Sequence, residues 1–376
     1  MRVAILGTGG IARAHVKALR ALSDSGVPIE LVGACDVDAE RVEAFATEWS
    51  IPAFYTDLAA MLGRQRPQVI HICTPPGAHA DLAIQCLLGG ADVVCEKPPV
   101  LSIAEIEAVQ AAELRTGRSY TTIFQHRFGS AGQHVRALIS AGALGAPRVA
   151  ICHTLWFRTP EYYEVPWRGN WEFEGGGPTL GHGVHQIDLL AYLLGEWDEV
   201  SATAVRLARD IETEDVSMAH VAFTNGALAS IVTSVLSPRE ESYVRLDFDD
   251  ATVEVSHVYG YADDHWTITP AKHVDADVAA CWALPGPVEP SSHLAQLRRV
   301  YAALADGTRP PGDSDSARAT MELVTGIYAA AFTNIPVRRS ELTPGHPFHA
   351  SLTGGATPPV PSSAGPRRSP SVNRST

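Results

Sequence analysis

A lysine in the sequence Glu96-Lys97-Pro98 directly follows a short apolar run at residues 92–95. An amine can exchange a proton with a hydroxyl group once burial or a neighbouring positive charge has lowered its pKa. Glu-Lys-Pro also occurs as a surface ion pair before a proline turn. The segments around Lys97 decide between these two interpretations.

A glycine-rich segment near the N-terminus has the spacing of a dinucleotide-binding loop. It lies between an apolar run and an amphipathic segment, fits the pattern Gly-x-Gly-x-x-Gly/Ala, and consists of Gly7, Thr8, Gly9, Gly10, Ile11 and Ala12. Glycine permits the tight turn and lets backbone amides approach a pyrophosphate, and alanine lets helix and strand pack closely. Asp36 follows the second apolar run, where its carboxylate can accept hydrogen bonds from a ribose. These residues predict a bound dinucleotide and favour NAD, while Arg41 leaves NADP open.

Further cofactor contacts are expected at the carboxyl edge of the predicted sheet, where open α/β sheets bind ligands. The third apolar run ends there at Thr74-Pro75-Pro76, with His79 shortly after. Thr74, Pro75 and His79 either contact the cofactor or form a proline turn with His79 as a helix cap. The ends of the next two runs add Glu96, Lys97 and Gln125 to the predicted cofactor contacts. Glu96 would hold the Lys97 ammonium or the ribose, or form a surface pair.

Short apolar runs alternate with amphipathic segments through residues 1–125. The runs at 3–6, 31–35, 69–73, 93–95 and 120–124 predict βαβ units around a parallel sheet that is buried on both faces. Residues 1–125 are therefore expected to form a Rossmann domain. Residues 354–376 are rich in Gly, Pro, Ser, Thr and Arg, and a disordered tail is predicted for them.

The pattern changes after residue 125, and residues 126–345 are predicted to form a substrate and oligomerisation domain. Strand-like runs between 199 and 270 favour a large, open, mostly antiparallel sheet, with a type I′ turn at Asn225-Gly226. The overall fold class is thus α/β, with an α+β second domain. Amphipathic stretches at about 292–305 and 314–333 are expected to be helices that cover one face of this sheet. The other face would meet solvent or another subunit, which predicts a homodimer or homotetramer.

Composition narrows the classes of partner. The net charge of −13 repels phosphate backbones and anionic lipid surfaces, so neither nucleic acid nor a membrane is an expected partner. No segment approaches the ~20 consecutive apolar residues that span a bilayer. The six cysteines show no Cys-x-x-Cys pairing, which favours reduced thiols and a cytoplasmic protein.

The chain resembles the Gfo/Idh/MocA oxidoreductase family. Four segments carry the resemblance: residues 7–12, Thr74-Pro75-Pro76 with His79, Glu96-Lys97-Pro98, and residues 175–188 with Leu189 and Leu190. The resemblance implies a Rossmann domain followed by a domain with a large open sheet. It also implies that Lys97 lies between nicotinamide and substrate as a catalytic residue.

The second catalytic segment departs from the family's commonest pattern, Asp-x-Gly-x-His. The histidine maps onto His185, but the carboxylate position is Gly181, which cannot titrate. His182 lies next to it and could replace the missing group, so His182 and His185 are expected to act in catalysis and to bind substrate. Asp188 either orients His185 or has a structural role. Imidazole and carboxylate groups at His182, His185 and Asp188 would suit zinc, but no metal is predicted because Lys97 already serves dehydrogenation.

Aromatic and polar residues are mixed between 156 and 171, which suits stacking on a sugar ring and hydrogen bonding to its hydroxyls. Trp167 and Arg168 are the residues of this group expected to bind substrate, with a place in the core as the alternative for the aromatics. Gln125 and Arg127 either meet nicotinamide or substrate or link the two domains, and Arg127 is included among the expected substrate contacts. The resemblance implies an NAD(P)-dependent dehydrogenase or reductase of a sugar, polyol or inositol-like small molecule. Two alternatives stay open: a glycosidase with a transient redox step, and a non-catalytic cofactor sensor.

Overall fold

Six parallel strands form the first sheet, in the order β3-β2-β1-β4-β5-β6. The computed structural model describes residues 1–284 and 289–355. The strands of this sheet are β1 (Arg2–Leu6), β2 (Glu30–Cys35), β3 (Phe54–Tyr55), β4 (Val69–Ile72), β5 (Asp92–Cys95) and β6 (Tyr120–Thr122). They alternate with the helices α1 (Ala12–Asp24), α2 (Ala39–Glu48), α3 (Leu58–Gln65), α4 (His79–Leu88) and α5 (Ile103–Thr116). The strand order is that of a Rossmann fold, as the sequence predicts.

Local sequence signals explain where these elements begin. Asp38, Asp57 and Ser102 stand at helix N-caps, and each side chain accepts a hydrogen bond from a backbone amide of the first turn. In β1, Val3, Ala4 and Ile5 have no exposed surface, because helices cover both faces of the sheet.

The second sheet has eight strands in the order β13-β12-β11-β7-β10-β9-β8-β14. All its pairings are antiparallel except that of β7 with β10, so the prediction of a mostly antiparallel sheet is confirmed. Its strands are β7 (Pro147–Phe157), β8 (Trp197–Val205), β9 (Val216–Phe223), β10 (Leu228–Ser234), β11 (Leu236–Phe248), β12 (Ala251–His257), β13 (Trp266–Pro270) and β14 (Val337–Arg338). The helices of this part are α6 (Ser130–Ser140), α7 (Pro178–Gly181), α8 (Val184–Leu194), α9 (Ala276–Ala280), α10 (His293–Asp306) and α11 (Ser314–Thr333).

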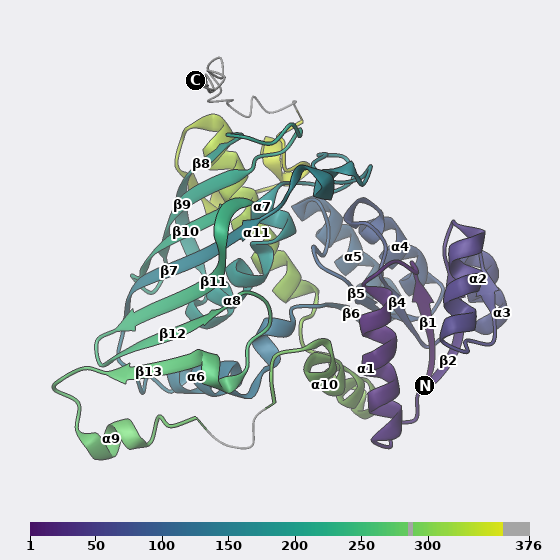
Figure 1. Cartoon of the computed structure of the whole chain (residues 1–376), viewed down its shortest axis with the longest axis horizontal. Coiled ribbons are helices and arrows are strands. Elements are labelled where there is room, and N and C mark those ends of the chain that lie inside the picture. The colour runs from purple at the N-terminus through teal and green to yellow at the C-terminus, as the bar shows by residue number, and fades with distance from the viewer. Residues whose placement is uncertain (285–288, 356–376) are drawn as a thin grey trace, which may run out of the picture.

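The two predicted C-terminal helices exist but do not share a location. Helix α11 packs on β8 of the second sheet and on α5, as expected. Helix α10 packs instead against α1 of the first sheet, and Leu297, Val300 and Tyr301 join its hydrophobic core (Figure 1). The prediction that both helices cover the second sheet is therefore wrong for α10. An apolar face shows that a helix is buried, but not against which partner.

The turn between β9 and β10 also differs from its prediction. A type I′ turn needs positive φ at both central residues, yet only Gly226 has one, at 90°, and Asn225 does not. The Phe223 amide donates to the Ala227 carbonyl and the Gly226 amide to the Phe223 carbonyl. The connection is a three-residue loop in which glycine takes the left-handed position.

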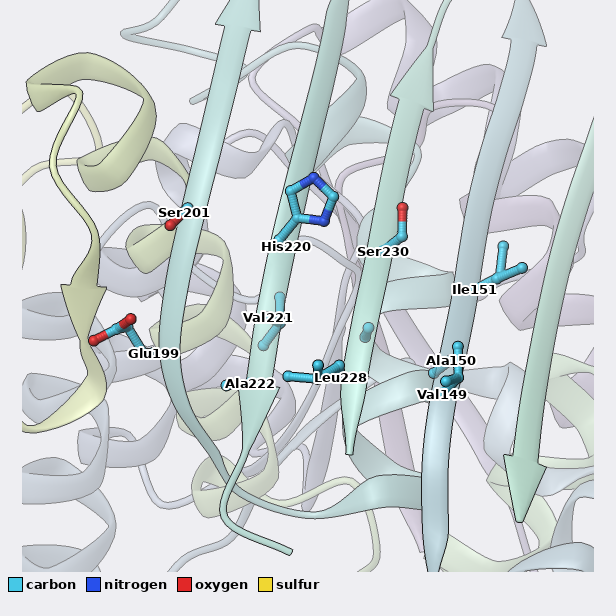
Figure 2. Close-up of a pocket in the computed structure, with 11 residues that line it drawn as sticks. Val149, Ala150, Ile151, Glu199, Ser201, His220, Val221, Ala222, Leu228 and Ser230 are labelled. Atoms are coloured by element: carbon cyan, nitrogen blue, oxygen red, sulfur yellow. The ribbon is translucent and has the colours of Figure 1, made fainter. Parts of the chain in front are cut away.

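One face of the second sheet is covered and the other is open. Helices α7, α8 and α11 lie on the side toward the first sheet, whereas the far side exposes Val149, Met218 and Leu228 (Figure 1). A shallow hollow of about 460 Å³ lies on this open face, and Figure 2 shows the residues that line it. It lies over four adjacent strands, and its lining includes Val149, Ile151, Ser201, His220, Leu228 and Ser230.

Other predictions concern the termini and the surroundings of the chain. The predicted disordered tail falls, from residue 356 onward, outside the described residues. Among the helices that the structure describes, none is long and apolar enough to cross a membrane. All six cysteines are unpaired, and only Cys281 is exposed.

Candidate active site

The glycine loop between β1 and α1 has the shape that a pyrophosphate requires. Gly7 has a φ of +86°, and a Cβ there would lie 2.7 Å from the backbone carbon of Cys73, so no other residue fits. A Cβ on Gly9 or Gly10 would meet no atom within 4 Å, so both glycines face open space. Ala12 is fully buried where α1 packs on the sheet. The loop therefore fits the phosphates of a dinucleotide.

Asp36 is fixed at the end of β2 by several donors. Its Oδ2 accepts hydrogen bonds from the Thr8 amide at 2.7 Å and the Thr8 hydroxyl at 2.9 Å. Arg41 holds both oxygens, with Nη2 at 2.6 Å from Oδ1 and Nε at 3.1 Å from Oδ2. Burial alone would raise the pKa of Asp36, but these hydrogen bonds lower it to about 2. The carboxylate is thus ionised, and its charge opposes a 2′-phosphate.

The turn after β4 contains two polar side chains, Thr74 and His79. The Thr74 hydroxyl is buried and has no hydrogen-bond partner among the described residues, so it is available to a bound ligand. His79 instead lies with Nδ1 at 2.7 Å from the Pro98 carbonyl and Nε2 at 2.8 Å from the Thr74 carbonyl. A neutral imidazole has one N–H, so it donates a hydrogen bond to one of these carbonyls, which is a structural contact; the cofactor contact of His79 stays a prediction.

Lys97 follows β5 and reaches across to the second sheet's helices. Its ammonium donates a hydrogen bond of 3.0 Å to the carbonyl of Gly181, the last residue of α7. Burial lowers the pKa of Lys97, with contributions from Arg168 and Arg158, while Glu96 and Glu174 oppose the shift. A surface ion pair before a turn is therefore excluded as the role of this lysine.

Glu96 is part of a buried polar network and does not bind the Lys97 ammonium. Its Oε1 lies 2.8 Å from Nε2 of both His15 and His293, and its Oε2 accepts from the Lys97 amide. Burial would raise the pKa of Glu96, but the two histidines hold it well below its usual value. Among the described residues, His15, Glu96 and His293 also form the one group with metal-ligand spacing. Their distances are those of hydrogen bonds.

His185, on α8, is the best-placed histidine for a substrate. It is buried, and neither ring nitrogen has a partner among the described residues. Its ring stacks on His126 with the centroids 4.7 Å apart. Burial and then Lys97 lower the pKa of His185 well below its usual value and that of His126 to about 3. Two neutral imidazoles therefore lie within electrostatic range of Lys97.

Gln125 lies beside this histidine pair, at the start of a single 3₁₀ turn. Its Nε2 donates to the Tyr259 hydroxyl at 2.9 Å, while its Oε1 is buried and has no partner in the part of the chain that the structure describes. The free oxygen makes Gln125 a suitable contact for a nicotinamide or a substrate.

The remaining polar wall comes from the loop between β7 and α7. His182 Nε2 lies 3.3 Å from Arg158 Nε and 3.3 Å from the Tyr162 hydroxyl. Burial, then Arg158, then Lys97 lower the pKa of His182 well below its usual value. Arg168 lies over the rings of Tyr162 and Trp167, at 3.9 and 4.3 Å from the centroids. This wall holds two guanidinium groups within electrostatic range of Lys97, and aromatic rings pack against these guanidinium groups.

Arg127 is turned away from this site. Its guanidinium forms a two-pronged ion pair with Asp188, with Nε at 2.7 Å from Oδ2, and Thr320 also donates to Asp188. Both charged side chains are almost fully buried. These contacts favour a structural role for Arg127, and substrate binding by Arg127 stays a prediction. The Asp188 carboxylate is bound to Arg127 and Thr320. It therefore does not orient His185, and it does not complete a zinc site with His182.

Three residues at the site were not predicted from the sequence. Glu174 is buried against Arg168 and the Gly169 amide, and His126 stacks on His185. His293 reaches Glu96 from α10. A signal existed for Glu174, since it directly precedes Gly175-Gly176-Gly177, but nothing local marks the two histidines.

Comparisons with known proteins agree with this architecture. Residues 1–124 match the model of an oxidoreductase family with an NAD-binding Rossmann fold, and residues 133–263 match the Gfo/Idh/MocA C-terminal domain. D-glucoside 3-dehydrogenase of Escherichia coli is 27% identical over 69% of this chain and 78% of that protein. D-apiose dehydrogenase of Paraburkholderia graminis is 25% identical over 94% of this chain and 93% of that protein.

A solved structure is similar over nearly the whole fold. The WlbA dehydrogenase from Bordetella pertussis, in complex with NADH and UDP-GlcNAcA, superposes with a TM-score of 0.80 at 26% identity. The match covers 90% of this chain and 98% of that one. The glycine loop, Asp36 and the sequence of the two domains agree with these matches. The chain therefore belongs to the Gfo/Idh/MocA family of NAD-binding oxidoreductases, and the members named above are sugar dehydrogenases.

Proposed function

We propose that this protein interconverts a secondary alcohol and a ketone on a sugar, polyol or inositol-like small molecule, with NAD as the cofactor. The observation that carries the proposal is Lys97, whose ammonium is hydrogen-bonded to the Gly181 carbonyl and lies within electrostatic range of His185, a buried histidine whose two ring nitrogens have no partner among the described residues. The named relatives, which include D-glucoside, D-apiose and inositol dehydrogenases, support the substrate class.

The residues that would hold the cofactor lie along one edge of the first sheet. Gly9 and Gly10 leave room for the pyrophosphate, Asp36 faces the adenosine ribose, and Thr74 and Gln125 offer free polar atoms near the other end. When bound, NAD⁺ supplies the acceptor for the hydride that leaves the alcohol carbon. Lys97 follows β5, at the same edge, and is placed to act on the hydroxyl of that carbon.

Lys97 handles the proton of the reaction. In the oxidation direction its neutral amine takes the hydroxyl proton. The carbon loses its hydrogen as hydride, and the carbon–oxygen single bond becomes the C=O double bond of a ketone. In the reduction direction the ammonium returns that proton to the developing alkoxide. His185 and His182 are neutral, so they can hydrogen-bond to hydroxyl groups and orient the ring.

Substrate binding is assigned to the wall of the loop before α7. Trp167 and Tyr162 offer flat apolar faces to a sugar ring, and Arg158 and Arg168 donate hydrogen bonds to its oxygen atoms. This wall and the histidines accept a polyhydroxylated compound better than an apolar alcohol.

The test is a substrate panel with the purified protein. Alkyl glucosides, D-apiose, inositols and nucleotide-linked sugars are each incubated with NAD⁺ or NADP⁺, and NADH absorbance is followed. We expect turnover with NAD⁺ on at least one member, together with the ketone product. Cleavage of a glycoside without net NADH would point to the glycosidase alternative, and cofactor binding without turnover on any compound would point to a sensor.

The predicted homo-oligomer is also proposed. The open face of the second sheet, with exposed Val149, Met218 and Leu228, supports it, because an apolar sheet surface gains free energy when a second copy covers it. Light scattering after size exclusion should give two or four chains, and Leu228→Asp should lower that number. A monomer at micromolar concentration would refute the proposal.

A further inference from the structure

A buried carboxylate that the family pattern does not predict lies beside the proposed base. We propose that Glu174 is the positioning residue that sets the charge state of Lys97 and so supplies the negative group that Gly181 lacks. This inference rests on the proposed proton-transfer role of Lys97. It is carried by the geometry of three residues: Glu174, Gly181 and Lys97.

The first observation is where the carboxylate lies. Gly181 has an ordinary backbone, and a Cβ built on it would have one neighbour within 4 Å, the Oε1 atom of Glu174 at 3.5 Å. The carbonyl of the same Gly181 accepts the hydrogen bond from Lys97. The oxygen of Glu174 therefore lies next to the position that the Cβ of an aspartate at position 181 would take.

The second observation is that the chain is built to hold Glu174 there. Its Oε2 accepts a hydrogen bond from the Gly169 amide, and its side chain is 7% exposed. The next three residues admit no side chain: a Cβ would lie 2.3 Å from Leu101 at Gly175, 2.2 Å from Tyr328 at Gly176 and 1.9 Å from Glu214 at Gly177. Close packing of this glycine run fixes the path from Glu174 to α7.

The third observation is the balance of charge around Lys97. The cations that face it are Arg158 and Arg168, and the anions are Glu96 and Glu174. Glu96 is already committed to His15 and His293. Glu174 Oε1 has one weaker contact, with Arg168 at 3.5 Å. Glu174 is therefore the carboxylate with bonding capacity left for Lys97 or for a substrate hydroxyl.

The histidines around Lys97 cannot supply this negative charge. His126, His182 and His185 all have pKa values lowered by burial first and by Lys97 next or later, so they remain neutral. A neutral imidazole does not offset the charge that Lys97 gains when it accepts a proton. In this proposal His182 therefore does not replace the missing carboxylate.

In the proposed reaction, Glu174 acts on the charge that Lys97 gains with one proton. When Lys97 takes the hydroxyl proton its amine becomes an ammonium, and the nearby Glu174 carboxylate stabilises that ammonium. Burial raises the pKa of Glu174, while the Gly169 hydrogen bond, Arg168 and Lys97 lower it. Its charge therefore depends on these neighbours, and substrate binding can change it.

The direct test measures Lys97 in the protein without substrate. The chain has three lysines, Lys17, Lys97 and Lys272, and only Lys97 is shielded from solvent, so isotope-labelled lysine side chains give three resolvable signals. Loss of one signal in Lys97→Met assigns it. We expect Glu174→Gln to lower the pKa of Lys97, because a group that raises it is removed. The matched control is Glu172→Gln, an exposed glutamate of the same loop, which should leave the titration unchanged.

A second test moves the carboxylate. Gly181→Asp in the Glu174→Ala background places a carboxylate in the space that the shortened side chain leaves, without backbone strain, and Glu174→Ala alone is its reference. We expect Glu174→Ala to lower kcat/KM on the order of 100-fold. The double variant should recover at least a tenth of the lost activity and raise the Lys97 pKa again. Thermal unfolding of each variant checks that the fold is retained.

The outcomes separate the two proposals. A Lys97 titration that is the same in Glu174→Gln and wild type overturns this inference, whatever the substrate panel gives. An altered titration with no turnover on any panel compound supports the inference and counts against the proposed function. Activity lost in Glu174→Ala and not recovered by Gly181→Asp, with Lys97 unchanged, shows a merely structural glutamate.

Discussion

The Lys97 ammonium donates a hydrogen bond of 3.0 Å to the Gly181 carbonyl, and this contact joins the end of β5 to the end of α7. One partner belongs to the parallel sheet that would hold the cofactor, and the other belongs to the helices on the second sheet. The reactive space therefore lies where the two sheets meet, and both are needed to define it.

Replacement of Lys97 tests its chemical role. Lys97→Met removes the amine but keeps an unbranched side chain of similar length, so the site should stay closed. We expect kcat to fall by about 10²–10⁴-fold, the usual contribution of a positioned acid or base. NADH binding, followed by fluorescence, should change less than threefold, as roughly expected for a residue that contributes to catalysis and not to affinity. Full turnover in this variant would refute the assignment.

The pH dependence follows from the sign of the Lys97 shift. Burial lowers its pKa below the usual 10.5, so the neutral amine forms at a lower pH than in an exposed lysine. As pH rises through the lowered pKa, Lys97 loses its proton and alcohol oxidation should speed up. Ketone reduction needs the ammonium and should slow down over the same range. Profiles of kcat/KM in both directions measure this, and an oxidation rate that rises only above 10.5 would contradict it.

Asp36 should govern cofactor choice. Its carboxylate holds Arg41, so Asp36→Ser removes a negative charge and releases a guanidinium at the same place. We expect kcat/KM to fall for NAD⁺ and to rise for NADP⁺, with a change in their ratio of roughly 100-fold, equivalent to about 2.7 kcal/mol. Asp38→Ser, an exposed neighbour that also contacts Arg41, is the control and should change the ratio far less.

The Asp36 carboxylate should also affect stability at low pH. Its folded pKa of about 2 lies below the usual 3.8, so its contribution is present above pH 3.8 and is lost as pH falls through the folded value. Because its partner Arg41 is half exposed, solvent screening limits this contribution to about 1 kcal/mol. Unfolding of wild type and Asp36→Ser should therefore converge as the pH approaches 2. A difference that persists at that pH would point to packing instead.

The buried pair of Arg127 and Asp188 should matter for stability. Asp188→Asn leaves the guanidinium buried without its counter-charge, and we expect it to lower the free energy of unfolding by about 3–5 kcal/mol. The double change Arg127→Met with Asp188→Leu removes both charges and should cost less than the single change. Denaturant unfolding curves measure both. If Arg127 bound substrate instead, KM would rise in Arg127→Met while stability stayed constant.

The Glu96 network should also be structural. Glu96→Gln keeps the shape but weakens the hydrogen bonds with His15 and His293, and we expect a loss of about 1–3 kcal/mol in unfolding free energy. Glu43→Gln, an exposed glutamate on α2, is the control and should change stability by less than about 0.5 kcal/mol. An unaltered unfolding curve for Glu96→Gln would contradict this account.

Sequence by itself determined the parts of this protein that depend on local spacing. The glycine loop, Asp36 at a strand end and the alternation of apolar runs are set by turn geometry and by burial on two faces, so residues 7–12, the Rossmann sheet and the position of Lys97 could be predicted. The same holds for the antiparallel second sheet. Local patterns also predicted that the segments of α10 and α11 are helical.

Only the tertiary structure decided which side chains meet. His79 and Arg127 were predicted to contact a ligand, and the role of Asp188 was left open; the structure gives each of them a partner from a distant segment. Two strands and two α-helices separate Glu174 from Lys97 along the chain, and packing of the glycine run brings Glu174 to the site. Spacing along the chain specifies the backbone path, whereas charge pairing in a buried site depends on contacts between remote segments.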